Sequence, residues 1–326
     1  MKRIYLFAAV TAIALAACTK TETTNVSGGN LIRFDNAFVG NVTKGDVSGT
    51  KLSAFWVYGQ YENSGNYVTV FNNTKVSEGT ADGSSTWTPE EIAYWIDGKS
   101  YVFAAYSDGN NKLDAGVSFT PGEKKLSISN YTVGENDLVA ATATADNVTA
   151  SSQTSVSLSF KHLLSKVRFT FTTSMADSYT MAVEGLTFNA VKTSCSVDFT
   201  DNQVGNWSGT AADYSYDSIS DFASGTEAFV EEYVIPQSNE NLVASFTVIV
   251  SDAAGEIGKK DFSDISLAYS GSESGTTQNT WTPGFAYNYT AEINLDDITD
   301  DAKPITFTVT SVPDFNPATD TPLTIE

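Results

Sequence analysis

The sequence predicts an all-β protein built from two tandem β-sandwich domains. Short runs alternate apolar and polar residues with a period of two, and Val, Thr, Phe and Tyr dominate them. Clusters of Gly, Asn, Asp and Ser separate the runs, as they do where a chain turns. Long helical periodicity is absent from the sequence. Many short strands at this spacing are typical of β-sandwiches.

Six runs carry the strongest strand signal, because each is rich in β-branched or aromatic residues. The predicted strands are residues 52–58, 101–106, 156–160, 167–171, 246–250 and 287–293. The main turn clusters between them are residues 108–111, 201–202 and 271–275.

The N-terminal segment has the features of a lipoprotein signal. Lys2 and Arg3 precede an apolar stretch, Ile4–Ala17, that is too short to span a bilayer comfortably. Small residues then lead directly to Cys18, which is the arrangement of a bacterial lipobox. We predict that residues 1–17 are a signal peptide, that Cys18 carries lipid, and that residues 18–30 form a flexible tether. The alternative is an ordinary secretory signal followed by a chance cysteine.

The rest of the chain is long enough for two domains. We place them at residues 31–152 and 153–326, with the seam in the polar stretch 150–153. A repeated motif favours two related domains: Thr86–Pro89 recurs as Thr280–Pro283, and an aromatic strand follows each copy. Coincidence among threonine-rich turns is the alternative explanation.

Composition excludes several classes of partner and cofactor. The chain has 18 Lys and Arg against 39 Asp and Glu, for a net charge of −21, which argues against nucleic-acid binding and against a polybasic membrane patch. Once Cys18 is lipidated, Cys195 is the one remaining cysteine, so a disulfide framework and a cysteine-rich zinc site are excluded. We predict no metal and no cofactor.

The sequence offers no convincing catalytic site. His162 is the single histidine and hence the one imidazole base available to a nucleophile; we predict that it is buried or caps a strand instead. Asp108–Asp114 looks like a calcium loop, but Lys112 occupies a ligand position and Thr120 replaces the final glutamate. Acidic residues are abundant, yet no feature selects a glycosidase pair. We therefore predict that the protein is not an enzyme.

Six short motifs, in order along the chain, resemble those of the fimbrillin family (Mfa-like proteins) of Bacteroidales, the subunits and anchors of type V pili. The most specific is residues 156–167, which is similar to the family's F.H.LSKV block. Asp108 stands where the family's AYSP segment has proline. The other motifs are Ile32–Phe34, Trp95 with Tyr101–Ser107, Asp137–Ala141, Tyr233–Gln237, and Trp281–Gly284 with Tyr287–Tyr289.

The resemblance implies two transthyretin-like domains and assembly by strand exchange. In that scheme the lipoprotein reaches the outer membrane, a protease cuts after a basic residue and removes the first strand, and a neighbour's C-terminal strand fills the groove. Candidate cut sites are Arg33 and Lys44. We prefer Lys44, because a cut there releases the strand around Ile32 and Phe34 whole. Family shaft subunits usually have arginine at this point, so lysine departs from the pattern.

The predicted donor strand lies within residues 305–326. Ile305, Phe307 and Val309 alternate with threonines and would face the acceptor groove. The alternative is that this strand completes its own domain.

These features predict a structural pilus protein, either a shaft subunit or an anchor, that supports adhesion from the outer-membrane surface. Its partners would be other pilus subunits, and the outer membrane through the N-terminal lipid. The alternative is a monomeric glycan-binding surface lipoprotein, in which Trp56, Trp87 or Trp207 stacks on sugar rings. An extracellular hydrolase has the least support.

Overall fold

The chain folds into β-strands almost throughout, as predicted. The computed structural model describes residues 30–39, 52–81, 84–114, 116–149, 151–152, 155–299 and 305–313. All six predicted strands are confirmed. The helical segments in these ranges are short, namely a 3-10 turn (Pro121–Glu123) and α1 (Leu295–Thr299). No helix among the described residues is long and apolar enough to cross a membrane.

Seven strands close into a barrel in the N-terminal half. Their order around the barrel is β1-β4-β3-β2-β5-β8-β9, and β1 closes it by pairing with β9 on one side and β4 on the other. The rings of Phe55, Phe71, Phe103 and Phe160 are fully buried inside. The strands are β1 (Phe34–Val39), β2 (Ala54–Asn63), β3 (Asn66–Ala81), β4 (Ser84–Pro89), β5 (Tyr101–Asp108), β8 (Leu138–Ala145) and β9 (Val156–His162).

Two sheets enclose a second core in the C-terminal half. The smaller sheet has the order β15-β10-β18-β19. The larger has the order β17-β16-β11-β7-β6, and three short strands also pair with β11. Phe169 and Tyr289 from the smaller sheet and Phe246 from the larger one lie in the shared core. The strands are β6 (Gly116–Thr120), β7 (Lys125–Thr132), β10 (Ser165–Thr172), β11 (Thr180–Thr200), β12 (Gln203–Val204), β13 (Ser208–Ser215), β14 (Ile219–Phe222), β15 (Ala228–Val234), β16 (Val243–Asp252), β17 (Gly255–Ser266), β18 (Phe285–Glu292) and β19 (Thr308–Pro313).

The 21-residue strand β11 links the two halves. Its first part pairs with β16, and its last part, Ser194–Thr200, pairs with β7. Strands β6 and β7 precede the last barrel strands in sequence, and they extend the larger sheet over the outside of the barrel. A third core lies beneath it, where Ile128 and Phe199 from the sheet join Tyr106 from the barrel wall. Burial of these apolar groups holds the halves together.

The predicted arrangement of two separate sandwiches is not confirmed. The N-terminal half is a closed barrel, because β1 bridges two strand edges that a sandwich would leave apart. Strands β6 and β7 fall in the predicted first domain, yet they pair with β11 of the predicted second domain. Trp87 and Trp281 of the repeated motif are both buried, but the first lies in a strand and the second in a loop. The seam at residues 150–153 stays a prediction.

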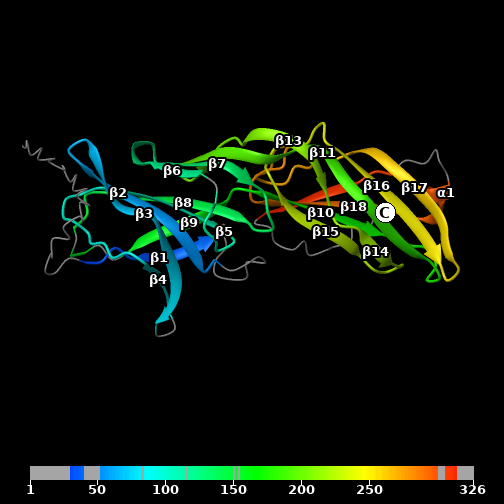
Figure 1. Ribbon diagram of the computed structural model, residues 1–326, viewed down its shortest axis with the longest axis horizontal. Helices are drawn as coiled ribbons and strands as arrows, with labels where there is room; N and C mark the ends of the chain where they lie inside the picture. Colours follow the sequence, from blue (N-terminus) through cyan, green and yellow to red (C-terminus); the bar gives the residue numbers. More distant parts are fainter. Residues whose placement is uncertain are drawn as a thin grey trace, which may run out of the picture.

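The molecule is elongated, with the barrel at one end and the two-sheet half at the other (Figure 1). We call the passage from β9 into β10 (His162–Ser165) the waist. The barrel pole is the outer end of the barrel, where residues 90–97 lie beside residues 30–32. The hairpin pole is the opposite end, at the turn between β16 and β17 (Asp252–Gly255).

Candidate functional site

Strand β1 is inserted between two other strands of the barrel. It pairs in parallel with β9 along most of its length, whereas its pairing with β4 consists of Phe34 opposite Trp87. Just before the strand, the backbone N–H of Ile32 donates to the carbonyl of Ala93 at 2.9 Å. The β4 side of β1 is therefore more weakly bonded than the β9 side.

The apolar side chains of this segment fill the barrel. Ile32 and Phe34 are almost fully buried. The ring centroid of Phe34 lies 5.6 Å from that of Phe55, 5.8 Å from Phe71 and 6.0 Å from Phe103. Removal of β1 would therefore expose an apolar groove with these three rings on its floor.

A polar clasp joins β1 to β9. Asp35 accepts a hydrogen bond from the Ser157 hydroxyl at 2.7 Å and a second from the Ser155 hydroxyl. Sequence reasoning missed this clasp, because Ser157 lies 122 residues further along the chain and nothing near Asp35 marks its partners.

Strand β19 is an edge strand of the smaller sheet and pairs antiparallel with β18. Ile305 is buried, and Phe307 and Val309 are partly buried against the C-terminal core. The Phe307 ring centroid lies 5.3 Å from Phe169 and 5.9 Å from Tyr289. In the single chain, the three predicted donor residues thus occupy their own domain.

Of the predicted lipidation site and the two candidate cut sites, the structure describes one cut site. Cys18 and Lys44 lie outside the described residues, so the lipid attachment and the preferred cut stay predictions. Arg33 is exposed between the buried Ile32 and Phe34, as alternation along an extended chain requires.

All three tryptophans considered for sugar binding are buried. Trp87 lies in the barrel core, and Trp56 and Trp207 lie in the core beneath the larger sheet. The Trp207 indole N–H donates to the backbone carbonyl of Leu163 at 3.0 Å. In this fold their faces are packed against protein, where they contribute to stability.

The waist contains a cluster of polar side chains. His162 is buried, which confirms the prediction, and its Nδ1 lies 2.6 Å from Asp137 Oδ2. Burial, reinforced by the neighbouring Asp137 carboxylate, raises the pKa of Asp108 to about 6. Among the described residues, no group of His, Cys, Asp and Glu side chains could hold a metal ion. The cluster therefore includes one carboxylate, Asp108, whose pKa lies above its usual range.

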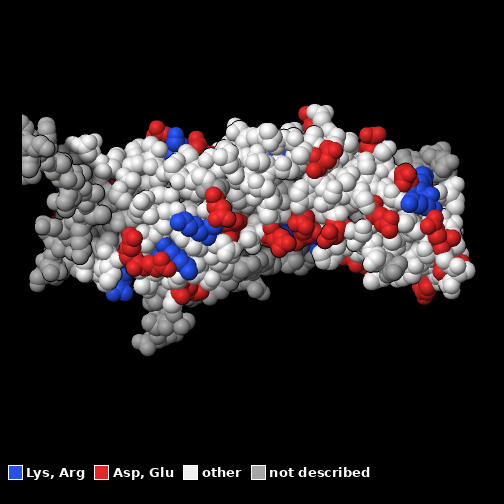
Figure 2. Space-filling model, viewed as in Figure 1, with Lys and Arg blue, Asp and Glu red and all other residues white. Residues whose placement is uncertain are grey.

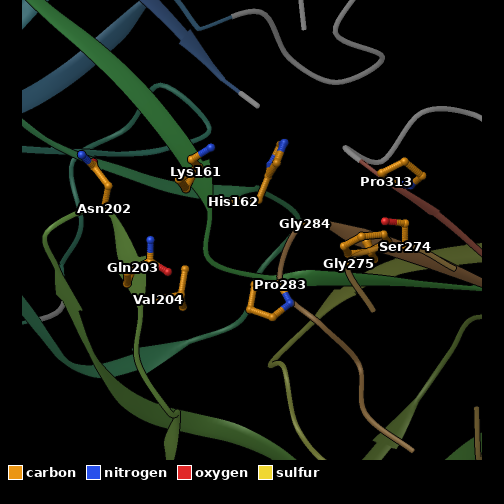
Figure 3. Close-up of a pocket in the computed structure, with 11 residues that line it drawn as sticks. Lys161, His162, Asn202, Gln203, Val204, Ser274, Gly275, Pro283, Gly284 and Pro313 are labelled. Atoms are coloured by element: carbon orange, nitrogen blue, oxygen red, sulfur yellow. The ribbon is translucent and has the colours of Figure 1, made fainter. Parts of the chain in front are cut away.

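One side of the waist is hollowed by a cavity of about 510 Å³ (Figure 3). Lys161 and His162 at the end of β9 contribute to one wall. Gly284 before β18 and Pro313 at the end of β19 contribute to another. The cavity therefore shows that β19 ends beside the barrel.

Asp108→Asn is expected to stabilise the protein above pH 7 by about 1–2 kcal/mol, after discounting for the partial exposure of the carboxylate. The pKa of Asp108 is raised from 3.8 to about 6 in the folded chain, so the native state binds the extra proton between these values. Stability from this group is therefore greatest at low pH and falls as the pH rises through about 6. Urea unfolding at pH 4, 6 and 8 measures the change.

Asp146→Asn is the matched control, because Asp146 is exposed on the barrel. It should leave the unfolding curves unchanged at all three pH values. If Asp108→Asn raised the free energy of unfolding equally at pH 4 and pH 8, the carboxylate charge would not be the cause.

Comparison with known proteins gives one family. The model of the family described as fimbrillin-like matches residues 41–311. No curated protein sequence matches the chain.

Solved structures share the fold at low sequence identity. A fimbrial protein from Bacteroides vulgatus is 14% identical, with a TM-score of 0.56, over 88% of this chain and 100% of that one. A candidate cell adhesion protein from Bacteroides uniformis is 17% identical, with a TM-score of 0.51, over 89% and 99% of the two chains. A third, from Parabacteroides distasonis, is 10% identical, with a TM-score of 0.50, over 87% and 96%.

Proposed function

The chain belongs to the fimbrillin-like family, and from this membership we propose that it is a structural pilus protein. It is exported as a lipoprotein, loses β1 by proteolysis, and joins other subunits at the cell surface by strand exchange. It acts as a shaft subunit or an anchor and supports adhesion, without catalysis. The fold shared with a fimbrial protein supports this role.

One observation carries the proposal: the two ends of the described chain have the same apolar pattern. Ile32 and Phe34 stand two residues apart and fill the barrel. Ile305 and Phe307 have the same spacing and lie directly before the edge strand β19, packed against the C-terminal core. A neighbour's Ile305 and Phe307 would therefore match the sites that the removal of Ile32 and Phe34 opens. Each well-buried apolar side chain contributes about 1.5–3 kcal/mol, which favours exchange once the groove is empty.

The strand directions support an end-to-end exchange. β1 runs from the barrel pole, where residues 30–32 lie, toward the waist, where Val39 is opposite Phe160. β19 ends at the waist, with Pro313 opposite Phe285, so Ile305 lies toward the hairpin pole. A β19 strand released from its own sheet would leave from the hairpin pole. It could enter a neighbour's barrel in the direction that β1 takes.

A cysteine pair tests the exchange in the full chain. If Phe307 replaces Phe34, then Thr308 takes the place of Asp35, whose partner on β9 is Ser157. Thr308→Cys combined with Ser157→Cys, in a Cys195→Ser background, should give intermolecular disulfides after limited trypsin digestion removes β1. Non-reducing gels should then show a ladder.

Thr308→Cys combined with Thr290→Cys is the control, because these residues are opposite each other within one chain. It should form an intramolecular disulfide that holds β19 on β18, so the oxidised chain should give no ladder after digestion, whereas the same chain reduced with dithiothreitol before digestion should polymerise. If the first pair never cross-links between chains, and locking β19 with the second pair does not stop polymerisation, β19 stays in its own domain and strand exchange is wrong.

Cys18→Ala is expected to abolish lipid attachment and membrane retention. The thiol at this position is the proposed site of acylation, and several acyl chains anchor a protein far more firmly than one. Metabolic labelling with a clickable palmitate analogue measures the effect, with Cys195→Ser as the control that keeps its label. Full labelling of the Cys18→Ala chain would contradict the lipoprotein assignment.

A further inference from the structure

The barrel pole carries an exposed apolar stripe. Ile92, Tyr94 and Ile96 are 69%, 41% and 40% exposed, and together we call them the pole stripe. They alternate with Ala93, which is partly buried, and Trp95, which is buried in the barrel core. One side of this segment thus packs into the barrel, while the other presents three large apolar side chains to solvent. Exposed apolar groups gathered in this way mark an interaction surface.

The pole stripe adjoins the segment that the proposed processing removes. The carbonyl of Ala93 accepts a hydrogen bond from Ile32 N at 2.9 Å, and Trp95 N donates to the carbonyl of Asn30 at 3.0 Å. Loss of residues 30–32 would open the groove directly beside the stripe. A neighbour whose strand enters the groove at this pole would lie against the stripe.

The hairpin pole has a smaller apolar site. Ile257, near the start of β17, is 44% exposed, and Lys259 two residues later is also exposed. These residues are at the opposite end of the long axis from the pole stripe (Figure 1). Two apolar sites at opposite ends allow copies to join head to tail, because such a contact uses a different surface on each partner.

Charged side chains lie beside both apolar sites. Glu90, Glu91 and Asp97 are exposed at the ends of the pole stripe. Figure 2 shows a small basic patch near the hairpin end, surrounded by acidic residues, and further basic side chains on the barrel. Lys259 belongs to the hairpin, so an end-to-end contact places its ammonium group near carboxylates at the facing pole.

We propose that the pole stripe binds the hairpin pole of a second copy of this chain. The proposal rests on the pilus function above, and it adds a contact between folded surfaces to the exchanged strand. Ile257 packs against the pole stripe, and Lys259 pairs with Asp97 or Glu91. The contact aligns the released β19 of one copy with the open groove of the next.

The triple variant Ile92→Ser, Tyr94→Ser, Ile96→Ser tests the proposal in the full chain. After trypsin digestion, its polymerisation rate should fall at least tenfold. Its binding of a synthetic peptide of residues 305–326, measured by fluorescence polarisation, should equal that of the wild type. Tyr67→Ser is the matched control, since Tyr67 is equally exposed but lies outside the stripe. If the triple variant fails to fold, Ile92→Ser alone replaces it, with the same expected direction.

A second measurement does not depend on strand exchange. A Tyr94→Cys chain mixed with an Ile257→Cys chain, both in a Cys195→Ser background, should give a mixed disulfide dimer faster than either chain alone. The proposal would be overturned if the triple variant polymerised at the wild-type rate, or if the mixed dimer did not form. Loss of binding to phosphatidylethanolamine vesicles by a triple variant that still polymerises would assign the stripe to a membrane instead. Failure of the wild type to bind the peptide would count against strand exchange alone.

Discussion

Phe34→Ala is expected to lower the free energy of unfolding of the unprocessed chain by about 3–5 kcal/mol. The ring is almost fully buried and lies within 6.0 Å of three other phenylalanine rings, so its loss leaves a cavity in the barrel. Under the proposed function, the same substitution should not change the stability of assembled polymer, because residue 34 leaves with β1. Urea unfolding of the precursor and heat dissociation of the polymer measure the two effects.

Phe55→Ala is the matched control for Phe34→Ala. Phe55 is fully buried and its ring centroid lies 5.6 Å from that of Phe34, but it belongs to β2 and stays after processing. Phe55→Ala should lower the stability of the precursor and of the polymer alike. A polymer from the Phe34→Ala chain that is as weak as the Phe55→Ala polymer would show that β1 is retained.

Phe307→Ala is expected to slow polymerisation at least tenfold and to lower the stability of the monomer by about 2 kcal/mol. Under the proposed function, Phe307 has one packing role in the monomer and another in the polymer. It packs against Phe169 and Tyr289 in its own chain and replaces Phe34 in the neighbour. The monomer effect is below that of a fully buried ring, because Phe307 is partly exposed. Unfolding curves and the growth of gel ladders measure the two effects.

Two controls separate these roles. Thr306→Ala, at an exposed neighbouring position, should change neither quantity. Phe246→Ala removes a ring 6.0 Å from Phe307 in the same core and should destabilise the monomer, while the chains that remain folded still polymerise. Polymerisation of the Phe307→Ala chain at the wild-type rate would mean that this residue is not a donor.

Strand positions were predictable from the sequence, whereas strand partners were not. The alternation of apolar and polar residues identifies which side of a strand is buried, and that is why Val156–His162 and Phe285–Glu292 were located correctly. The alternation of apolar and polar residues does not identify which other strand pairs with a given strand. The parallel pairing of β1 with β9 and the pairing of β7 with β11 join residues far apart in the chain. No local sequence pattern specifies which distant strands pair.

The candidate site was predictable to a similar degree. Ile32 and Phe34 were identified as a first strand by resemblance, and the structure places them in the barrel core. His162 was predicted to be buried or to cap a strand, because it stands at the end of a predicted strand, and the structure shows it buried. The Asp35 clasp and the pole stripe were missed, because each depends on which segments the fold brings together.

The path of β11 determines how the protein responds to a pulling force. This strand passes beside the waist and is hydrogen-bonded to β16 on the hairpin side and to β7 over the barrel. Tension applied between the poles loads these hydrogen bonds in shear, so many must break together, whereas peeling would break them one at a time. The two halves should therefore extend as one mechanical unit, which suits a filament held in flowing liquid.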